Sequence, residues 1–369
     1  MQVNLFRPKV REHAVTAVAE VLRSGWIGMG ARTQEFERAF ATYAGAPHCV
    51  ALNNCTSALH LALRVLDLPP GAEVVTTAVT FIATNLAIVY EHLTPVFADI
   101  NPATGNIDPQ SIAARLTPHT GAIMIMHYGG NPCDLDEIYT LAQQHSLPVV
   151  EDCAHAAGAR YRSRPIGSHD SLQAFSFDPT KNLTCGEGGA LTFRNPDFEA
   201  RLRRLRYLGM DRDNYSRFRA PTTNGRTWDY HVSEPGFRYH MSDIHAAIGL
   251  AQLPFLTEDN YRRAEIADRY RAGLHGVPGI TLLVRDADRE SSNFMFCLLC
   301  ETRDELLEKL AAHGVGASVH FRRNDEFPMF ERQDLPNAAA FCSRVMTLPM
   351  HPGLTDEEVD FVIRLVREG

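Results

Sequence analysis

Long uninterrupted apolar runs are missing from this sequence. The longest ones, such as Gly121–Met126 and Phe294–Cys300, are far shorter than the roughly 20 residues that a membrane-spanning helix requires. We therefore expect no membrane span. Near the start, Arg7, Pro8 and Lys9 interrupt the apolar residues before the core of a signal peptide could form. These features predict a cytoplasmic protein.

An excess of basic residues is missing as well. The chain has 36 Lys+Arg against 44 Asp+Glu, which gives a formal charge of −8. No segment gathers enough basic side chains to neutralise a run of phosphates. Nucleic acid is therefore not an expected partner.

Cysteines are few and show no pairing pattern. The eight cysteines are scattered, and most stand inside apolar runs, which is typical of small buried hydrophobic side chains in a reducing compartment. Cys297 and Cys300 form a C-x-x-C, but no second pair of Cys or His stands at metal-ligand spacing. We expect neither a disulfide framework nor a metal site.

The chain has the length and composition of a globular protein with two domains. Of its 369 residues 45% are hydrophobic and 22% charged, and domains commonly hold roughly 100–200 residues. Between about residues 48 and 195, short apolar runs alternate with segments of helical period, which predicts an α/β fold with a mostly parallel sheet covered by helices. Strands are expected at 49–52, 73–77, 95–99, 122–127, 147–152, 174–177 and 189–193, and helices at 56–63, 81–90, 107–116 and 134–144.

The second half of the sequence has a different pattern. Residues 209–240 are aperiodic and polar, which predicts a long functional loop region and a candidate intersubunit contact. A helical stretch follows over 241–271, and apolar runs at 280–284, 293–300 and 315–321 around a helix at 303–313 predict a smaller α+β domain. Thr355 and Glu358 have the spacing of a capping box before a final helix. We expect a large domain over residues 1–250, including an N-terminal arm, and a small C-terminal domain over 251–369.

Two residues of opposite charge indicate a reactive site. Lys181 stands in a Gly-rich loop between apolar strands, where partial desolvation could lower its pKa and make it a Schiff-base nucleophile. Asp152 ends a preceding parallel strand and would lie at the same edge of the sheet. Taken singly, such a lysine is usually solvated and such an aspartate usually belongs to a turn. Together they suit pyridoxal 5'-phosphate (PLP), which needs a lysine for its aldimine and a carboxylate to keep its pyridine nitrogen protonated.

The motifs around these residues resemble those of the DegT/DnrJ/EryC1/StrS family of PLP-dependent sugar aminotransferases, which have the type I aminotransferase fold. The resemblance spans nearly the whole chain. Its ordered segments are Ser24–Gly30, Asn54–Leu63, Thr80–Thr84, Asp108, Glu151–Ala156, Gly167–Ser168, Phe175–Leu183, Gly186–Ala190, Gly209–Asp213, Met241–Leu253 and Pro349–Glu358.

The resemblance implies a role for each cofactor contact. It identifies Lys181 as the aldimine lysine, Asp152 as the partner of the pyridine nitrogen, and His155 as a contact of the phenolic oxygen. It identifies Phe81 as the aromatic residue stacked on the ring, although a residue at that place in a helix is more often core.

The phosphate of PLP is expected at residues from three segments. Thr56 and Ser57 begin a helix directly after a strand, where free N–H groups and the helix dipole favour a phosphate. The resemblance adds the hydroxyl of Ser176. It also aligns Arg238 with a family position that reaches the phosphate from the partner subunit, which implies a homodimer with shared active sites.

The resemblance implies a nucleotide-sugar substrate and an amino-acid donor, with glutamate the expected donor and a nucleotide-linked 4-keto-6-deoxyhexose the expected acceptor. Residues expected at the substrate are Trp26, His320, Arg322 and Arg323; the two arginines could equally be a surface pair. A lysine at 181 disfavours the related dehydratases, which resemble this family but carry His there. A cyclitol aminotransferase and a non-catalytic PLP- or sugar-binding protein remain as alternatives.

Overall fold

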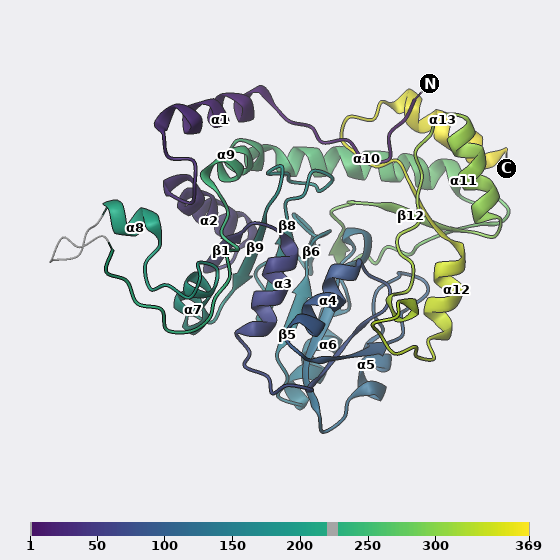
Figure 1. The fold of residues 1–369 in the computed structure, drawn as a ribbon. Coiled ribbons are helices and arrows are strands. Elements are labelled where there is room, and N and C mark those ends of the chain that lie inside the picture. The colour runs from purple at the N-terminus through teal and green to yellow at the C-terminus, as the bar shows by residue number, and fades with distance from the viewer. Residues whose placement is uncertain (1, 220–227, 369) are drawn as a thin grey trace.

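The computed structural model describes residues 2–219 and 228–368, so part of the predicted loop at 209–240, residues 220–227, lies outside the described chain. Its centre is a seven-stranded sheet with the strand order β1-β9-β8-β5-β4-β2-β3 (Figure 1). The strands are β1 (His48–Leu52), β2 (Glu73–Thr77), β3 (Thr94–Ala98), β4 (Thr120–Met126), β5 (Val149–Asp152), β8 (Leu172–Ser176) and β9 (Gly189–Phe193).

The sheet is parallel except for one strand. β9 pairs antiparallel with both β1 and β8, while β8, β5, β4, β2 and β3 pair parallel with one another. The parallel strands alternate with helices, as the apolar periodicity predicted. The predicted α/β fold class is confirmed.

Helices cover both faces of the sheet, which explains why the strands are apolar throughout rather than alternating. One face packs on α2 (Ala31–Ala44), α5 (Pro109–Arg115), α6 (Leu135–Gln144) and α9 (Asp243–Gln252). The other packs on α3 (Cys55–Arg64), α4 (Ile82–Tyr90) and α7 (Asp197–Leu205). Within β1, for example, Ala51 faces the first core and Val50 the second.

The C-terminal part builds a separate core around a three-stranded antiparallel sheet. Its strands are β10 (Ile280–Leu282), β12 (Phe296–Cys300) and β13 (Val345–Leu348), and its helices are α10 (Leu256–Leu274), α11 (Arg303–Ala312), α12 (Pro336–Arg344) and α13 (Asp356–Arg367). Val3 packs into this core from the N-terminus, and Figure 1 shows both chain ends on the α13 side of the molecule. The domain boundary after residue 250 stays a prediction.

Several predicted elements differ in the structure. The helical stretch expected over 241–271 is broken into α9, a 3-10 turn at Leu253–Phe255 and α10, because Pro254 lacks an N–H and its ring crowds the preceding turn. The apolar run at 315–321 forms only single bridges, from Val315 to Val3 and from Ser318 to Thr347. The capping box of Thr355 and Glu358 is confirmed, and Cys297 and Cys300 lie in a buried strand, as expected.

The remaining described elements belong neither to the seven-stranded sheet nor to the sheet of β10, β12 and β13. They are α1 (Glu12–Ser24), α8 (Asn214–Arg219), the 3-10 turns at Tyr128–Gly130 and Asn324–Glu326, and a small sheet of β6 (Arg160–Tyr161), β7 (Arg164–Pro165) and β11 (Arg289–Glu290). Figure 1 shows α8 projecting from the body beyond α7. Among the described helices, none combines the length and the apolar character needed to cross a membrane.

Candidate active site

A cavity of about 430 Å³ opens at the carboxyl ends of the central strands. Met126, Asp152 and Ser176 end β4, β5 and β8 and line this cavity, which is where open α/β sheets bind ligands. The predicted residues that the structure brings together on its wall are Thr56, Phe81, Asp152, His155, Ser176, Lys181 and His320.

Lys181 lies in the loop between β8 and β9. Its backbone N–H donates to the carbonyl oxygen of Asp178 at 3.0 Å, and its Nζ atom lies 4.3 Å from the ring centroid of Phe294. Burial lowers the pKa of the Lys181 ammonium, and the negative charge of Asp152 opposes that shift only in part. The amine can therefore lose its proton closer to neutral pH than an exposed lysine can.

Asp152 is buried at the end of β5, and both of its oxygens have donors. Oδ2 accepts a hydrogen bond from Thr84 Oγ1 at 2.6 Å, and Oδ1 accepts one from the N–H of Ala154 at 2.9 Å. Burial raises the pKa of the Asp152 carboxyl, while the Thr84 hydrogen bond acts in the opposite direction. Thr84 in turn hydrogen-bonds Thr80, Oγ1 to Oγ1, at 2.7 Å. Sequence reasoning missed Thr84, because only the fold shows that the first turn of α4 reaches the end of β5.

The side chain of His155 is buried at the cavity. Its ring stacks on Phe294 with centroids 4.3 Å apart, and burial, then the charge of Lys181, lower its pKa well below the ordinary value. The Nδ1 atom is buried and has no hydrogen-bond partner among the described residues. Because an unpaired buried nitrogen is unfavourable, a ligand with a polar atom beside His155 would stabilise the site.

The start of α3 forms the polar end of the cavity. Asn54 caps this helix by accepting a hydrogen bond from the N–H of Ser57 at 2.8 Å; Thr56 lines the cavity. Ser57 lies off the wall, and its hydroxyl donates to Asn53 Oδ1 at 2.7 Å. The helix N-terminus gives this end a partial positive charge.

Gly189 lets strand β9 approach that helix start. A Cβ at this position would stand 2.7 Å from the backbone nitrogen of Cys55, and it would also meet the backbone of Asn54. Any side chain would therefore push the α3 N-terminus away from the sheet, which explains the second glycine of the Gly188–Gly189 pair.

Aromatic rings form a further part of the cavity wall. The periodicity predicted a helix that begins at Phe81, but Phe81 lies in extended backbone just before α4. Its side chain is 57% exposed. Phe6, Phe294 and Phe321 line the cavity with it, and Phe81 and Phe321 have centroids 6.2 Å apart. An exposed aromatic side chain at a cavity suits a flat ligand. Sequence reasoning missed the other three rings. Phe321 stands between the predicted His320 and Arg322, whereas Phe6 and Phe294 lie outside the motifs.

His320 also reaches the cavity from the C-terminal part. Its Nδ1 atom lies 2.8 Å from Thr347 Oγ1. Burial, with a smaller effect of Lys181, lowers the pKa of His320 to about 4, so the ring is neutral near pH 7.

Besides Ser57, four predicted residues lie off the cavity wall of this chain. Arg323 is buried against Asp325, with its Nε 2.9 Å from Oδ1, and Arg322 is exposed beside Glu326 at 3.2 Å. Trp26 donates from Nε1 to the carbonyl oxygen of Met29 at 3.0 Å, and Arg238 is exposed.

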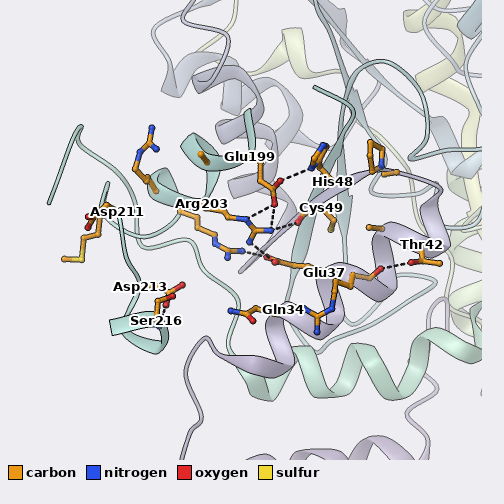
Figure 2. A pocket seen from close by; sticks show the side chains of 18 residues that line it. Gln34, Glu37, Thr42, His48, Cys49, Glu199, Arg203, Asp211, Asp213 and Ser216 are labelled. Atoms are coloured by element: carbon orange, nitrogen blue, oxygen red, sulfur yellow. Dashed lines mark hydrogen bonds and ion pairs between the residues drawn. The ribbon is translucent and has the colours of Figure 1, made fainter. Parts of the chain in front are cut away.

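A larger cavity of about 830 Å³ lies elsewhere, beside α2, β1 and α7 (Figure 2). Glu37 is buried there between Arg203 and Arg206; burial disfavours its charge, but the two arginines outweigh it and hold its pKa below the ordinary value. Glu199 hydrogen-bonds both Arg203 and His48, as Figure 2 shows. These charges neutralise one another, so the cavity is lined by a structural ion network.

The buried cluster of His127, Glu151 and Cys153 lies one residue from Asp152 and could by spacing hold a metal ion. His127 and Glu151 already use their ligand atoms, since His127 Nε2 pairs with Glu151 at 2.9 Å and Nδ1 accepts from the N–H of Cys133 at 3.1 Å. Glu151 also accepts from other buried donors, including Ser171 at 2.6 Å. The cluster therefore anchors β5 instead.

The chain is similar to known proteins in both sequence and fold. A model of the DegT/DnrJ/EryC1/StrS aminotransferase family matches residues 8–367. The chain is 40% identical over 374 residues to the spore coat polysaccharide biosynthesis protein SpsC of Bacillus subtilis (strain 168), covering 98% of this chain and 95% of SpsC.

Two solved structures have nearly the same fold. AtS13 from Actinomadura melliaura superposes with a TM-score of 0.93 at 37% identity, covering 100% of this chain and 99% of AtS13. The putative sugar aminotransferase Spr1654 from Streptococcus pneumoniae has a TM-score of 0.93 at 31% identity in its PMP form, covering 100% and 98%; it is also known in a PLP form. The resemblance read from the motifs and the type I aminotransferase fold are confirmed.

Proposed function

The chain belongs to the DegT/DnrJ/EryC1/StrS aminotransferase family of PLP-dependent sugar aminotransferases, and on that premise we propose that it transfers an amino group from glutamate to a nucleotide-linked 4-keto-6-deoxyhexose. The observation that carries the proposal is the meeting of Lys181 and Asp152 on one buried cavity wall, with the start of α3 at its polar end.

The residues of the cavity fit PLP. The unpaired Nδ1 of His155, the exposed ring of Phe81 and the helix start at Thr56 offer a hydrogen bond, a stacking surface and an anion site. When bound, PLP supplies a protonated pyridine ring that withdraws electrons from the carbon bearing the transferred nitrogen. Asp152 would hold the proton on the pyridine nitrogen, Ser176 and Thr56 would bind the phosphate, and Lys181 would hold the cofactor covalently.

Lys181 is also the proton carrier in this proposal. Its Nζ atom would take a proton from the donor's α-carbon and return one to the cofactor, and the reverse transfer would complete amination of the ketone. Such a base works best when its pKa is near the operating pH, and burial shifts Lys181 in that direction. The aromatic wall would exclude water from this proton.

The cavity's charge supports a homodimer. Among the described residues that line it, Lys181 is the sole lysine or arginine, while Asp152, Asp178 and Glu187 are carboxylates. A phosphate added to this wall needs further positive charge. Arg238 has no hydrogen-bond or ion-pair partner among the described residues of its own chain, and we assign it to the phosphate of the partner subunit's site.

Complementation tests this exchange. Subunits carrying Lys181→Ala are mixed with subunits carrying Arg238→Ala. If each arginine serves the other site, the heterodimer has one intact site and regains activity that both parents lack. Absence of recovery in a verified heterodimer would place Arg238 in its own chain's site.

The substrate is tested by incubating the PMP form with a panel of ketones and following both the cofactor spectrum and the product mass. The expected result is turnover of nucleotide-linked 4-keto-6-deoxyhexoses, with glutamate regenerating the amino form. Turnover of free keto-inositols alone would indicate a cyclitol aminotransferase. Failure with every amino donor would indicate a binding protein.

A further inference from the structure

Glu187 is, with Asp178, one of two carboxylates of the cavity wall that the proposed chemistry does not use. It lies in the loop after Lys181, lines the cavity and is exposed. Among the described residues it has neither a hydrogen-bond nor an ion-pair partner. The neighbouring Asp178, by contrast, accepts a hydrogen bond from the N–H of Thr180 at 2.9 Å.

The surroundings of Glu187 make an unpaired negative charge unfavourable. Partial burial, and then the charge of Asp178, raise the pKa of Glu187 above its ordinary value. A phosphate bound at Thr56 and Ser176, on the same wall, would add further negative charge. A cation beside Glu187 would therefore favour its charged form.

The exposed Arg238 lies in a segment that pairs with the end of β1, close to the start of α3. Residues next to it pair with the end of β1: His240 bridges to Leu52, and the carbonyl oxygen of Tyr239 accepts a hydrogen bond from the N–H of Asn53 at 2.7 Å. The loop that holds Glu187 reaches the start of α3 as well, because Gly189 abuts the backbone of Cys55. A two-fold axis near this helix start would bring each arginine to the other subunit's cavity.

We propose that Glu187 is the docking carboxylate for Arg238 of the partner subunit, an ion pair between two copies of this chain that holds the guanidinium at the phosphate end of the cavity. This inference rests on the proposed homodimer. It assigns to Glu187 a positioning role: the carboxylate orients an arginine, and the arginine contacts the phosphate.

A double-mutant cycle on the holoenzyme tests the pair. Glu187→Gln, Arg238→Gln and the double variant are compared for dimer dissociation by sedimentation and for PLP retention by dialysis. Close interfacial charge pairs have strong coupling, so each single change should weaken the dimer about tenfold or more, and the double variant should be no weaker than the worse single variant. If the two single changes weaken the dimer independently, so that their fold-changes in dissociation multiply in the double variant, the proposal is wrong.

A variant in which the two charges are swapped separates the effect on dimer dissociation from the effect on PLP retention. Glu187→Arg combined with Arg238→Glu should restore the dimer while PLP retention stays poor, because a carboxylate then faces the phosphate. Asp178→Asn replaces Glu187→Gln in a control cycle with Arg238→Gln. Arg322→Gln replaces Arg238→Gln in a second control cycle with Glu187→Gln. Neither control cycle should show coupling. Circular dichroism verifies that every variant is folded.

Three results would refute the inference in different ways. If Glu187→Gln leaves the dimer and PLP retention unchanged and raises only the KM for the ketosugar, Glu187 contacts substrate. If the wild type is active as a monomer, the homodimer proposal fails and this inference fails with it. If a dimer persists without coupling, the homodimer stands and only the inference is wrong.

Discussion

Replacing Thr84 with valine should shift the acid side of the activity profile. Thr84 is fully buried in α4, and its Oγ1 lies 2.6 Å from Asp152 Oδ2. Valine keeps the shape and removes the donor. Because this hydrogen bond favours the ionised form of Asp152, its loss must raise the pKa of that carboxyl.

The magnitude follows from the type of bond. A hydrogen bond to a charged group contributes about 1.5–3 kcal/mol, and one pKa unit corresponds to about 1.4 kcal/mol, so the pKa of Asp152 should rise by roughly one to two units. Thr80, which lies 2.7 Å from the Thr84 hydroxyl, also loses its partner, at a cost to stability of about 1–3 kcal/mol.

The assay is the half-reaction with glutamate, followed by cofactor absorbance between pH 5 and 9. Asp152 must be ionised to hold the pyridine proton, so the acid limb of the Thr84→Val profile should move to higher pH by about the same one to two units. Thr84→Ser, which keeps the hydroxyl, should follow the wild type. An acid limb unmoved in Thr84→Val, with only a lower melting temperature, would show that Thr84 is purely structural.

Three further predictions concern the cofactor, a glycine and acid stability. Lys181→Ala should abolish transamination, and borohydride reduction of the wild type should label Lys181 by mass spectrometry; label on another lysine would contradict the assignment. Gly189→Ala should weaken PLP binding at least about tenfold, since its Cβ would meet the Cys55 nitrogen at 2.7 Å; dialysis measures this, and unchanged affinity would show that the turn adapts. Burial lowers the pKa of both His320 and His351 to about 4. Between about pH 6.5 and 4 the folded state therefore binds fewer protons than the unfolded state. The free energy of unfolding should be highest above pH 6.5 and decrease toward pH 4, by at most roughly 3 kcal/mol per histidine. Urea titrations check this, and equal stability at pH 7.5 and 4.5 would contradict it.

Local patterns in the sequence determined the sheet, its covering helices and the two central groups of the site. Apolar runs covered on both faces and separated by helical periods allow few arrangements other than parallel strands. Lys181 and Asp152 were found because the ends of parallel strands meet at one edge, which is a property of the fold class and needs no further contact information. The helix start at Thr56 followed from the same strand-to-helix pattern.

Contacts between distant segments were decided only by the tertiary structure. Phe6, Phe294 and Phe321 reach the cavity from the N-terminus and the C-terminal part, and no periodicity relates them to Lys181. Arg322 and Arg323 are adjacent in sequence, yet Arg323 is buried on Asp325 while Arg322 is exposed.

The tertiary structure alone also decided the hydrogen-bond partners of the site. Thr84 could be placed on a helix from the sequence, but its bond to Asp152 depends on the fold bringing the first turn of α4 to the end of β5. Periodicity reports which face of an element is apolar, because that face repeats along the chain. A single polar contact leaves no such repeat, so the three-dimensional packing alone determines which hydroxyl meets which carboxylate.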